Sequence, residues 1–253
     1  MHRSSASRPR RRTVALTAAT ALVLSVAPLG AVAAQAAPTA AVSAATTRGL
    51  HVVRTDHLKG TEGSLTYDVA IPVFAGSGAA VTVNRRVRSS AWTTIRATAK
   101  ETLGGDRVHH TLGGSGRVTT NDGRTVQVVT EYADYFDRAA HPTDTVATVA
   151  LVARTGAPIV LSDVFKHQRS AFTVLGREVE RIAARQDEPV TDRSGLAPRA
   201  ANWTAWQTTR TGFQVHFQDY QLGGHGLRVY TVPWRTVAPL LSAEARTLLA
   251  PRR

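Results

Sequence analysis

The chain has 253 residues, a formal net charge of +13, 43% hydrophobic residues and no cysteine. The apolar content excludes a wholly disordered or collagen-like chain, and the length allows one large domain or two small ones with a hydrophobic core. The lack of cysteine excludes a disulfide scaffold, a thiolate zinc site and a cysteine nucleophile.

The first 36 residues have the order of a secretory signal peptide. Five arginines lie within the first 12 residues, and a run without charged residues follows from Val14 to Ala27. Pro28 and Gly30 interrupt the apolar stretch before Ala34-Gln35-Ala36, a small-x-small triplet of the kind that signal peptidase accepts. The sequence therefore predicts cleavage of residues 1–36 and a secreted, extracytoplasmic protein. An uncleaved membrane anchor is the alternative, and both the general secretory and the twin-arginine export routes stay open.

Removal of the signal peptide lowers the net charge of the chain. The remaining chain has 26 basic and 18 acidic residues, hence a net charge of +8. The basic residues are scattered among the acidic ones, which is typical of a solvated surface. We therefore expect no nucleic-acid partner, whereas acidic polymers of the cell envelope are partners that this charge favours.

Residues 37–47 are an uncharged low-complexity segment, which predicts a flexible leader. An N-terminal subdomain is expected over residues 48–160. Its apolar residues recur every four positions from Val83 to Leu103, which indicates an amphipathic helix with Gly104 as its C-cap. Alternating patterns and the hairpin signal Asp122-Gly123 indicate strands. The predicted strands are residues 65–71, 107–120, 124–136 and 145–153.

A C-terminal subdomain is expected over residues 161–250. Phe172, Leu175, Val179 and Ile182 have the spacing of one helical face. A hairpin of residues 213–218 and 227–232 follows, and then one closing helix with Val237, Leu240, Leu241 and Leu248. Seven of the 15 aromatic residues lie between residues 203 and 234 and are interpreted as the core of this half. The element order predicts an α+β fold of mostly antiparallel sheets, two long helices and a C-terminal helix, in two packed subdomains.

The histidines and glycines do not indicate a metal or nucleophile site. No histidine pair has the His-Glu-x-x-His spacing, and no loop resembles an EF-hand, so neither a metal nor another cofactor is expected. His109 and His110 point to opposite faces of a strand and are interpreted as a solvent-exposed pair. Residues 113–116, Gly-Gly-Ser-Gly, are interpreted as a flexible turn rather than a nucleophile elbow.

Three carboxylates lie close together in the sequence, Glu131, Asp134 and Asp137. On a strand, residues 131 and 137 share a face but are about 20 Å apart. That separation is too large for the carboxylate pair of a glycosidase. We therefore predict no catalytic residues.

Four segments, in their order and spacing, resemble the RsiV-like family of extracytoplasmic domains. They are residues 67–74 (Tyr-Asp-Val-Ala-Ile-Pro-Val-Phe) with Val83-Asn84; residues 135–142, ending in Ala-His-Pro; residues 154–156 (Arg-Thr-Gly) with 161–165 (Leu-Ser-Asp-Val-Phe); and residues 212–221 with Gly226, Val232-Pro233-Trp234 and Leu240-Leu241. The family includes the outer domain of the anti-sigma factor RsiV, which binds lysozyme, a secreted immunogenic protein, and a module beside some peptidoglycan deacetylase domains. The resemblance implies an α+β binding domain outside the membrane, without established catalytic residues.

Two departures from the family bear on the partners. About a dozen residues precede Val14, too few for a cytoplasmic sigma-binding domain, so no sigma-factor partner is expected. The loop after Tyr220 is shortened to residues 222–226, Leu-Gly-Gly-His-Gly, and lacks the Pro-aromatic segment of the family. The net charge of +8 would also repel basic lysozymes during encounter, so both features argue against lysozyme binding.

These observations lead to a hypothesis of a secreted, non-enzymatic protein that binds a cell-envelope polymer or an extracellular host protein. We expect Tyr135, His141, Tyr220 and His225 to contact the ligand in the cleft or rim between the two halves; core packing is the alternative for both tyrosines. A peptidoglycan-directed envelope hydrolase that activates water with His141 or Asp134 is the alternative function. If the signal is uncleaved, the protein is a membrane-tethered sensor.

Overall fold

The computed structural model describes residues 49–103 and 105–251. The predicted signal peptide, the whole of the predicted leader and Gly104 lie outside these residues. Within them the chain forms eight strands in two sheets and five α-helices, and five of the six strand pairings are antiparallel. The predicted α+β class with mostly antiparallel sheets is therefore confirmed.

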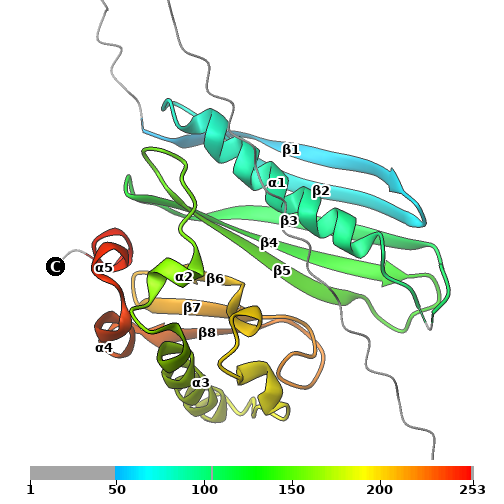
Figure 1. Cartoon of the computed structure of the whole chain (residues 1–253). Helices are drawn as coiled ribbons and strands as arrows, with labels where there is room; N and C mark the ends of the chain where they lie inside the picture. The colour runs from blue at the N-terminus through cyan, green and yellow to red at the C-terminus, as the bar shows by residue number, and fades with distance from the viewer. Residues whose placement is uncertain (1–48, 104, 252–253) are drawn as a thin grey trace, which may run out of the picture. The chain divides into compact units, whose positions relative to one another are not determined.

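The larger sheet has five strands in the order β1-β2-β3-β4-β5 (Figure 1). Its strands are β1 (His51–Glu62), β2 (Leu65–Ala75), β3 (His110–Asn121), β4 (Thr125–Phe136) and β5 (Thr143–Val152). β2 and β3 are parallel, and the crossover between them is α1 (Ala80–Thr98); every other pair in this sheet is antiparallel. β1 was not predicted, because it is an edge strand in which Leu58 alone is buried.

The helix α1 covers one face of this sheet (Figure 1). Val83, Val87, Ala91 and Ile95 are buried and belong to the same apolar cluster as the alternating residues of β2. Burial of such a stripe is what stabilises an amphipathic helix. The helix ends at Thr98 with Ala99 as its C-cap, so the prediction that it continues through Leu103 to a glycine cap was wrong.

The interpretation of residues 113–116 as a flexible turn was also wrong, because they lie within β3. Gly114 faces Tyr132 of β4, and a Cβ atom there would lie 2.8 Å from Cδ1 of that tyrosine. The glycine is therefore needed for the close approach of a ring and not for a bend. The hairpin turn between β3 and β4 is at Asp122-Gly123, as predicted, and Gly123 has a φ of +80°.

The smaller sheet has three antiparallel strands, β6 (Trp206–Thr208), β7 (Gly212–Phe217) and β8 (Arg228–Pro233). The helix α3 (Gln168–Arg185) packs on it (Figure 1). The predicted aromatic core is present here: the rings of Phe172 and Trp203 are stacked 5.4 Å apart, and Phe217 lies edge-on to Trp203. Together with Phe213 and Tyr230 these residues form the centre of the second apolar cluster.

Short helical elements complete the chain. They are α2 (Leu161–Val164), α4 (Trp234–Val237), α5 (Ala243–Leu249) and the 3-10 turns Arg193–Leu196, Ala200–Trp203 and Ala238–Leu240. The single closing helix that we predicted is divided, because Leu241 is extended and bridges to Phe165. The Ser242 hydroxyl then accepts from the backbone N–H of Ala245 and begins α5 as its N-cap.

Polar side chains join the two sheets. The Gln127 amide of β4 donates to Oγ1 of Thr208 at 2.6 Å, and its Oε1 accepts from the Thr208 backbone N–H at 2.7 Å. Gln218, after β7, bonds in the same two-way manner to the backbone of Val146 in β5. These bonds fix the segment after β7 against the edge of the larger sheet.

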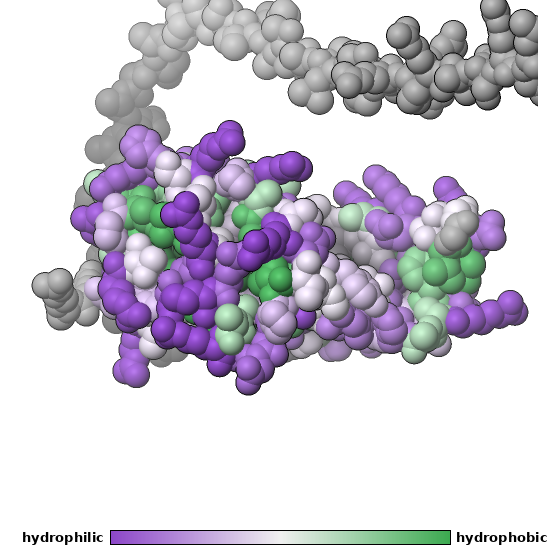
Figure 2. Space-filling view, turned by 90° about the horizontal axis from the view of Figure 1, so that it is seen from below, coloured by the Kyte–Doolittle hydropathy of each residue, from purple (hydrophilic) through white to green (hydrophobic). Residues whose placement is uncertain are grey.

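The surface seen in Figure 2 is largely hydrophilic, and its hydrophobic residues form small separate patches. A small apolar patch is normal on a protein surface. None of the helices within residues 49–103 and 105–251 has the length and hydrophobicity that a bilayer crossing needs.

Candidate functional site

A cavity of about 830 Å³ lies beside the C-terminal end of α1, at the edge of the larger sheet that β5 forms. Its walls include Thr98 of α1, Asp134 of β4 and Thr145 of β5, and the loop residues His141 and Gln218 complete them. Cavities of this volume are typical of small-molecule sites. The wall is rich in threonine and contains the carboxyl groups of Glu101 and Asp134 and an imidazole, so it suits a ligand that forms hydrogen bonds.

Asp134 is connected to a fully buried histidine. The Nδ1–H group of His110 donates to Oδ1 of Asp134 at 2.8 Å, and the imidazole is stacked on Phe136 with the ring centres 4.3 Å apart. Burial raises the pKa of the Asp134 carboxyl above its usual range, although the bond to His110 acts in the opposite direction. The carboxyl group can therefore hold a proton at the cavity wall more readily than an exposed aspartate.

His109 and His110 do point to opposite faces of the strand, but they are not an exposed pair. His110 is buried, whereas His109 lies on the open face near Thr66 and Asp137. His110 lies two residues before the buried Leu112 on β3, so the two side chains share a face of the sheet. This alternation could have indicated that His110 is buried. The interpretation of an exposed pair was therefore wrong for His110.

Two buried polar atoms at this site have no hydrogen-bond partner among the described residues. They are Nε2 of His110 and Oγ1 of Thr145. A buried polar atom without a partner costs about 1–3 kcal/mol. Such atoms are rare in native proteins, so each requires an explanation. Thr145 lies in the cavity wall, so a polar molecule in the cavity can reach its hydroxyl, whereas His110 is fully buried and does not line the cavity.

A cluster of aromatic side chains lies at the rim of this cavity. His141 is a member of this cluster and also lines the cavity. The Nδ1 atom of His141 lies 2.9 Å from the carbonyl of Pro142 and so carries the proton, which leaves Nε2 to accept from the Tyr220 hydroxyl at 3.1 Å. The ring of His225 lies 4.0 Å from that of His141. The structure therefore brings together three of the four predicted site residues, which are up to 84 positions apart in the sequence.

The carboxylate of Asp219 holds this rim in place. It is only 1% exposed, and it accepts from the backbone N–H of Gly226 at 2.6 Å and from Nδ1 of His225 at 3.0 Å. The next residue, Tyr220, is 49% exposed and has a φ of +59°, a left-handed conformation that is costly for a side chain of this size. Such strain at an exposed aromatic residue is typical of binding sites.

Tyr135 lies apart from the other three. It points to the face of β4 opposite to Asp134, is 40% exposed and has no contact with the rim within the described residues. Both tyrosines are thus exposed, and the alternative of core packing is wrong for each. Sequence reasoning missed His110 and Thr145, since pairing across strands is not visible in a single segment.

The described residues contain no group of three or more His, Asp or Glu side chains arranged to hold a metal ion. The cavity instead offers carboxyl groups, threonine hydroxyls, and imidazole and phenol groups at the rim. These groups can donate to and accept from a polar ligand. A tightly held nucleophile and base pair, which acyl transfer needs, is not formed by the lining residues.

Comparison with known proteins relates this fold to solved structures. No protein-family model and no curated protein matches the sequence. The crystal structure of a DUF3298 family member from Bacteroides fragilis is 12% identical, with a TM-score of 0.53 over 80% of this chain and 97% of that chain. A DUF3298 family protein from Pseudomonas aeruginosa is also 12% identical, with a TM-score of 0.52 over 81% and 98% of the two chains. The protein therefore has the fold of a DUF3298-type domain, a domain of unknown function.

Proposed function

We propose that the protein is a secreted, non-enzymatic binding protein of the RsiV-like type, which takes a cell-envelope or extracellular ligand in the cavity beside β5. The observation that carries this proposal is the pairing of a cavity whose wall contains the unpartnered hydroxyl of Thr145 with a strained, exposed aromatic rim. A ligand with hydroxyl, amide or carboxyl groups provides the missing hydrogen-bond partner in the cavity. Contact with Tyr220 and His225 at the rim stabilises the bound ligand.

The sequence supports the proposed extracytoplasmic location of the protein. Residues 1–36 have the pattern of an export signal, and no cysteine needs a reducing compartment. Two segments support the resemblance to RsiV-like domains: residues 154–156 lie in the connection after β5, and residues 161–165 are α2 and the residue that follows it. The positive charge of the chain favours an acidic envelope polymer and argues against basic lysozymes as partners.

Affinity capture tests the binding function. The chain without its signal, immobilised and exposed to envelope and host fractions, is expected to retain a component that His141→Ala and Tyr220→Phe retain less well. The exposed Tyr135 is the matched control, because Tyr135→Phe changes the same atom on the opposite face of the sheet. Full retention by folded His141→Ala and Tyr220→Phe variants contradicts the proposal.

A peptidoglycan-directed hydrolase is the second candidate, and one observation favours it. Asp134 combines a place in the cavity wall with a raised pKa, which is a property of general acids. This function predicts release of soluble fragments from purified cell wall and loss of that release in Asp134→Asn. If the purified protein releases no fragments from cell wall, the hydrolase function is excluded.

Cleavage decides between a free protein and a membrane-tethered sensor. N-terminal sequencing of the protein from culture medium is expected to begin at Ala37. Recovery of the chain only in membranes, with residues 14–36 still attached, favours the sensor.

A further inference from the structure

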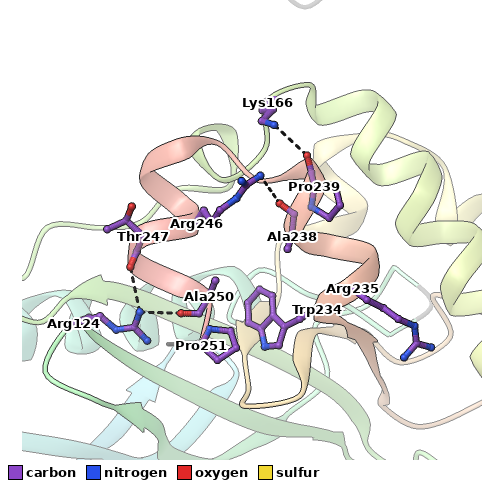
Figure 3. Close-up of a pocket in the computed structure, with 10 residues that line it drawn as sticks. All are labelled: Arg124, Lys166, Trp234, Arg235, Ala238, Pro239, Arg246, Thr247, Ala250 and Pro251. Atoms are coloured by element: carbon purple, nitrogen blue, oxygen red, sulfur yellow. Dashed lines mark hydrogen bonds between the residues drawn. The ribbon is translucent and has the colours of Figure 1, made fainter. Parts of the chain in front are cut away.

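A second cavity, separate from the first, lies near the end of the described chain (Figure 3). Its volume is about 1070 Å³, and it shares no lining residue with the cavity beside β5. α4, the 3-10 turn Ala238–Leu240 and α5 form most of its wall, and Arg124, at the tip of the β3–β4 hairpin, and Lys166 complete it.

The charge of this second cavity is of one sign. Four of its ten lining residues are cationic, namely Arg124, Lys166, Arg235 and Arg246, and none is acidic. Arg124 is already engaged, because it forms an ion pair with Asp122 and its Nη1 donates to the carbonyls of Thr247 and Ala250. Its role is structural, and of the other three cations Arg235 also interacts electrostatically with Glu178, so Lys166 and Arg246 carry the unbalanced charge.

Those three cations retain unused donors. Lys166 Nζ donates to the carbonyl of Pro239 at 3.3 Å, and Arg246 Nη2 donates to that of Ala238 at 2.8 Å, as Figure 3 shows. These bonds satisfy carbonyls at the end of a helical segment, which explains why cations stand there. They use one donor of the three on a lysine and one of the five on an arginine. Arg235 makes no hydrogen bond with the described residues.

Apolar groups make up most of the remaining wall. The indole of Trp234 is held by its Nε1–H, which donates to the carbonyl of Thr209 at 3.0 Å, so its ring orientation is fixed. Pro239, Pro251 and Ala250 add further apolar surface. A fixed aromatic surface beside cations with unused N–H groups suits a ligand that has an apolar body and a negative group.

We propose that this second cavity binds a small organic anion, with its phosphate or carboxylate group on Lys166 and Arg246 and its apolar body against Trp234. A cation is repelled by the lining charges. An uncharged apolar molecule gains nothing from the unused donors. This site does not depend on the function of the cavity beside β5.

Calorimetric titration with phenyl phosphate tests the site, and the indole N–H signal of Trp234 in nitrogen-15 NMR spectra shows where it binds. We expect saturable binding that weakens as salt is raised, together with a shift of the Trp234 signal. Benzyl alcohol is an uncharged compound of similar size. It is expected to bind at least about tenfold more weakly, since charge-assisted bonds contribute about that factor.

Substitutions of the cationic side chains test which of them bind the anion. Lys166→Gln is expected to weaken phenyl phosphate binding several-fold, and the double variant Lys166→Gln/Arg246→Gln about tenfold or more. Arg85→Gln, on the exposed side of α1, is the matched control and should bind like the wild type. If the double variant does not fold, Lys166→Gln alone decides, because its side chain is exposed. Absence of binding, equal binding of benzyl alcohol, unchanged affinity of Lys166→Gln, or an equal loss in Arg85→Gln overturns the proposal.

Discussion

The Nδ1 atom of His110 lies 2.8 Å from Oδ1 of Asp134, and this bond joins two neighbouring strands inside the protein rather than on its surface. Asp134 is thereby part of both the interior and the cavity wall. A change in its protonation therefore acts on a hydrogen bond inside the protein.

The buried histidine is expected to be essential for stability. His110→Ala should lower the free energy of unfolding by about 2–4 kcal/mol, because it leaves the Asp134 carboxyl buried without its partner and opens a void beneath Phe136. Chemical denaturation followed by circular dichroism measures the change. The neighbouring His109 is 52% exposed, and His109→Ala should stay within about 0.5 kcal/mol of the wild type. Equal losses for the two variants would contradict the assignment.

The adjacent glycines of β3 should respond in opposite ways to the same substitution. Gly114→Ala brings a methyl group within 2.8 Å of the Tyr132 ring and 3.1 Å of Val69, and should cost about 1–3 kcal/mol. A Cβ atom at Gly113 meets nothing within 4 Å, so Gly113→Ala should leave the stability unchanged or raise it by up to about 1 kcal/mol. Thermal unfolding of the two variants gives the comparison, and a stable Gly114→Ala protein would show that Tyr132 is free to move.

His216 is expected to make the protein sensitive to mild acid. Burial, reinforced by the charge of Arg117, lowers its pKa from 6.5 to about 4, so the folded state holds the neutral ring, which accepts from the Gln207 amide. Between pH 6.5 and 4 the unfolded chain binds the proton and the folded chain does not. The contribution of His216 is therefore complete above pH 6.5 and is lost as pH falls toward 4, by up to about 3 kcal/mol.

Denaturation at a series of pH values tests this dependence. The difference in unfolding free energy between the wild type and His216→Gln should shrink steadily from pH 6.5 to pH 4. His51→Gln, at an exposed position, is the control and should leave the slope of the wild type unchanged. A parallel pH profile for the wild type and His216→Gln would mean that the pKa of His216 is the same in the folded and the unfolded protein.

The rim should lose its order when its buried carboxylate is removed. Asp219→Ala frees the N–H group of Gly226 and the ring of His225, and should cost about 1–3 kcal/mol. Faster hydrogen exchange at the Gly226 amide reports the local effect. Asp68→Ala removes an aspartate whose ion pairs with His57 and Lys59 are half exposed, and it should leave that amide unchanged. Unaltered exchange in Asp219→Ala would show that other bonds hold the loop.

Local patterns predicted the elements that bury a regular stripe. The alternation at residues 65–71, the four-residue spacing in α1 and the Asp-Gly turn each depend on neighbours in the sequence, and each is present. β1 has no such pattern, because an edge strand buries few side chains. The break at Leu241 arises from its bridge to Phe165, a contact that the helical pattern does not contain.

The candidate site was predictable only in part, for the same reason. His141, Tyr220 and His225 were selected on a motif resemblance, and the fold alone places them side by side. The bond between His110 and Asp134 depends on the register of β3 against β4, in which residue 112 faces residue 134. Register follows from the whole hydrophobic pattern of a sheet rather than from either residue.

The two bonds of Arg124 to Thr247 and Ala250 join groups that are 123 and 126 positions apart. The larger sheet ends at Val152, so none of its strands contains the residues that carry these carbonyls. Until α5 docks, the guanidinium group has only Asp122 as a partner. Contacts of such long range slow folding, and we expect the docking of α5 to be a late step in the maturation of this protein.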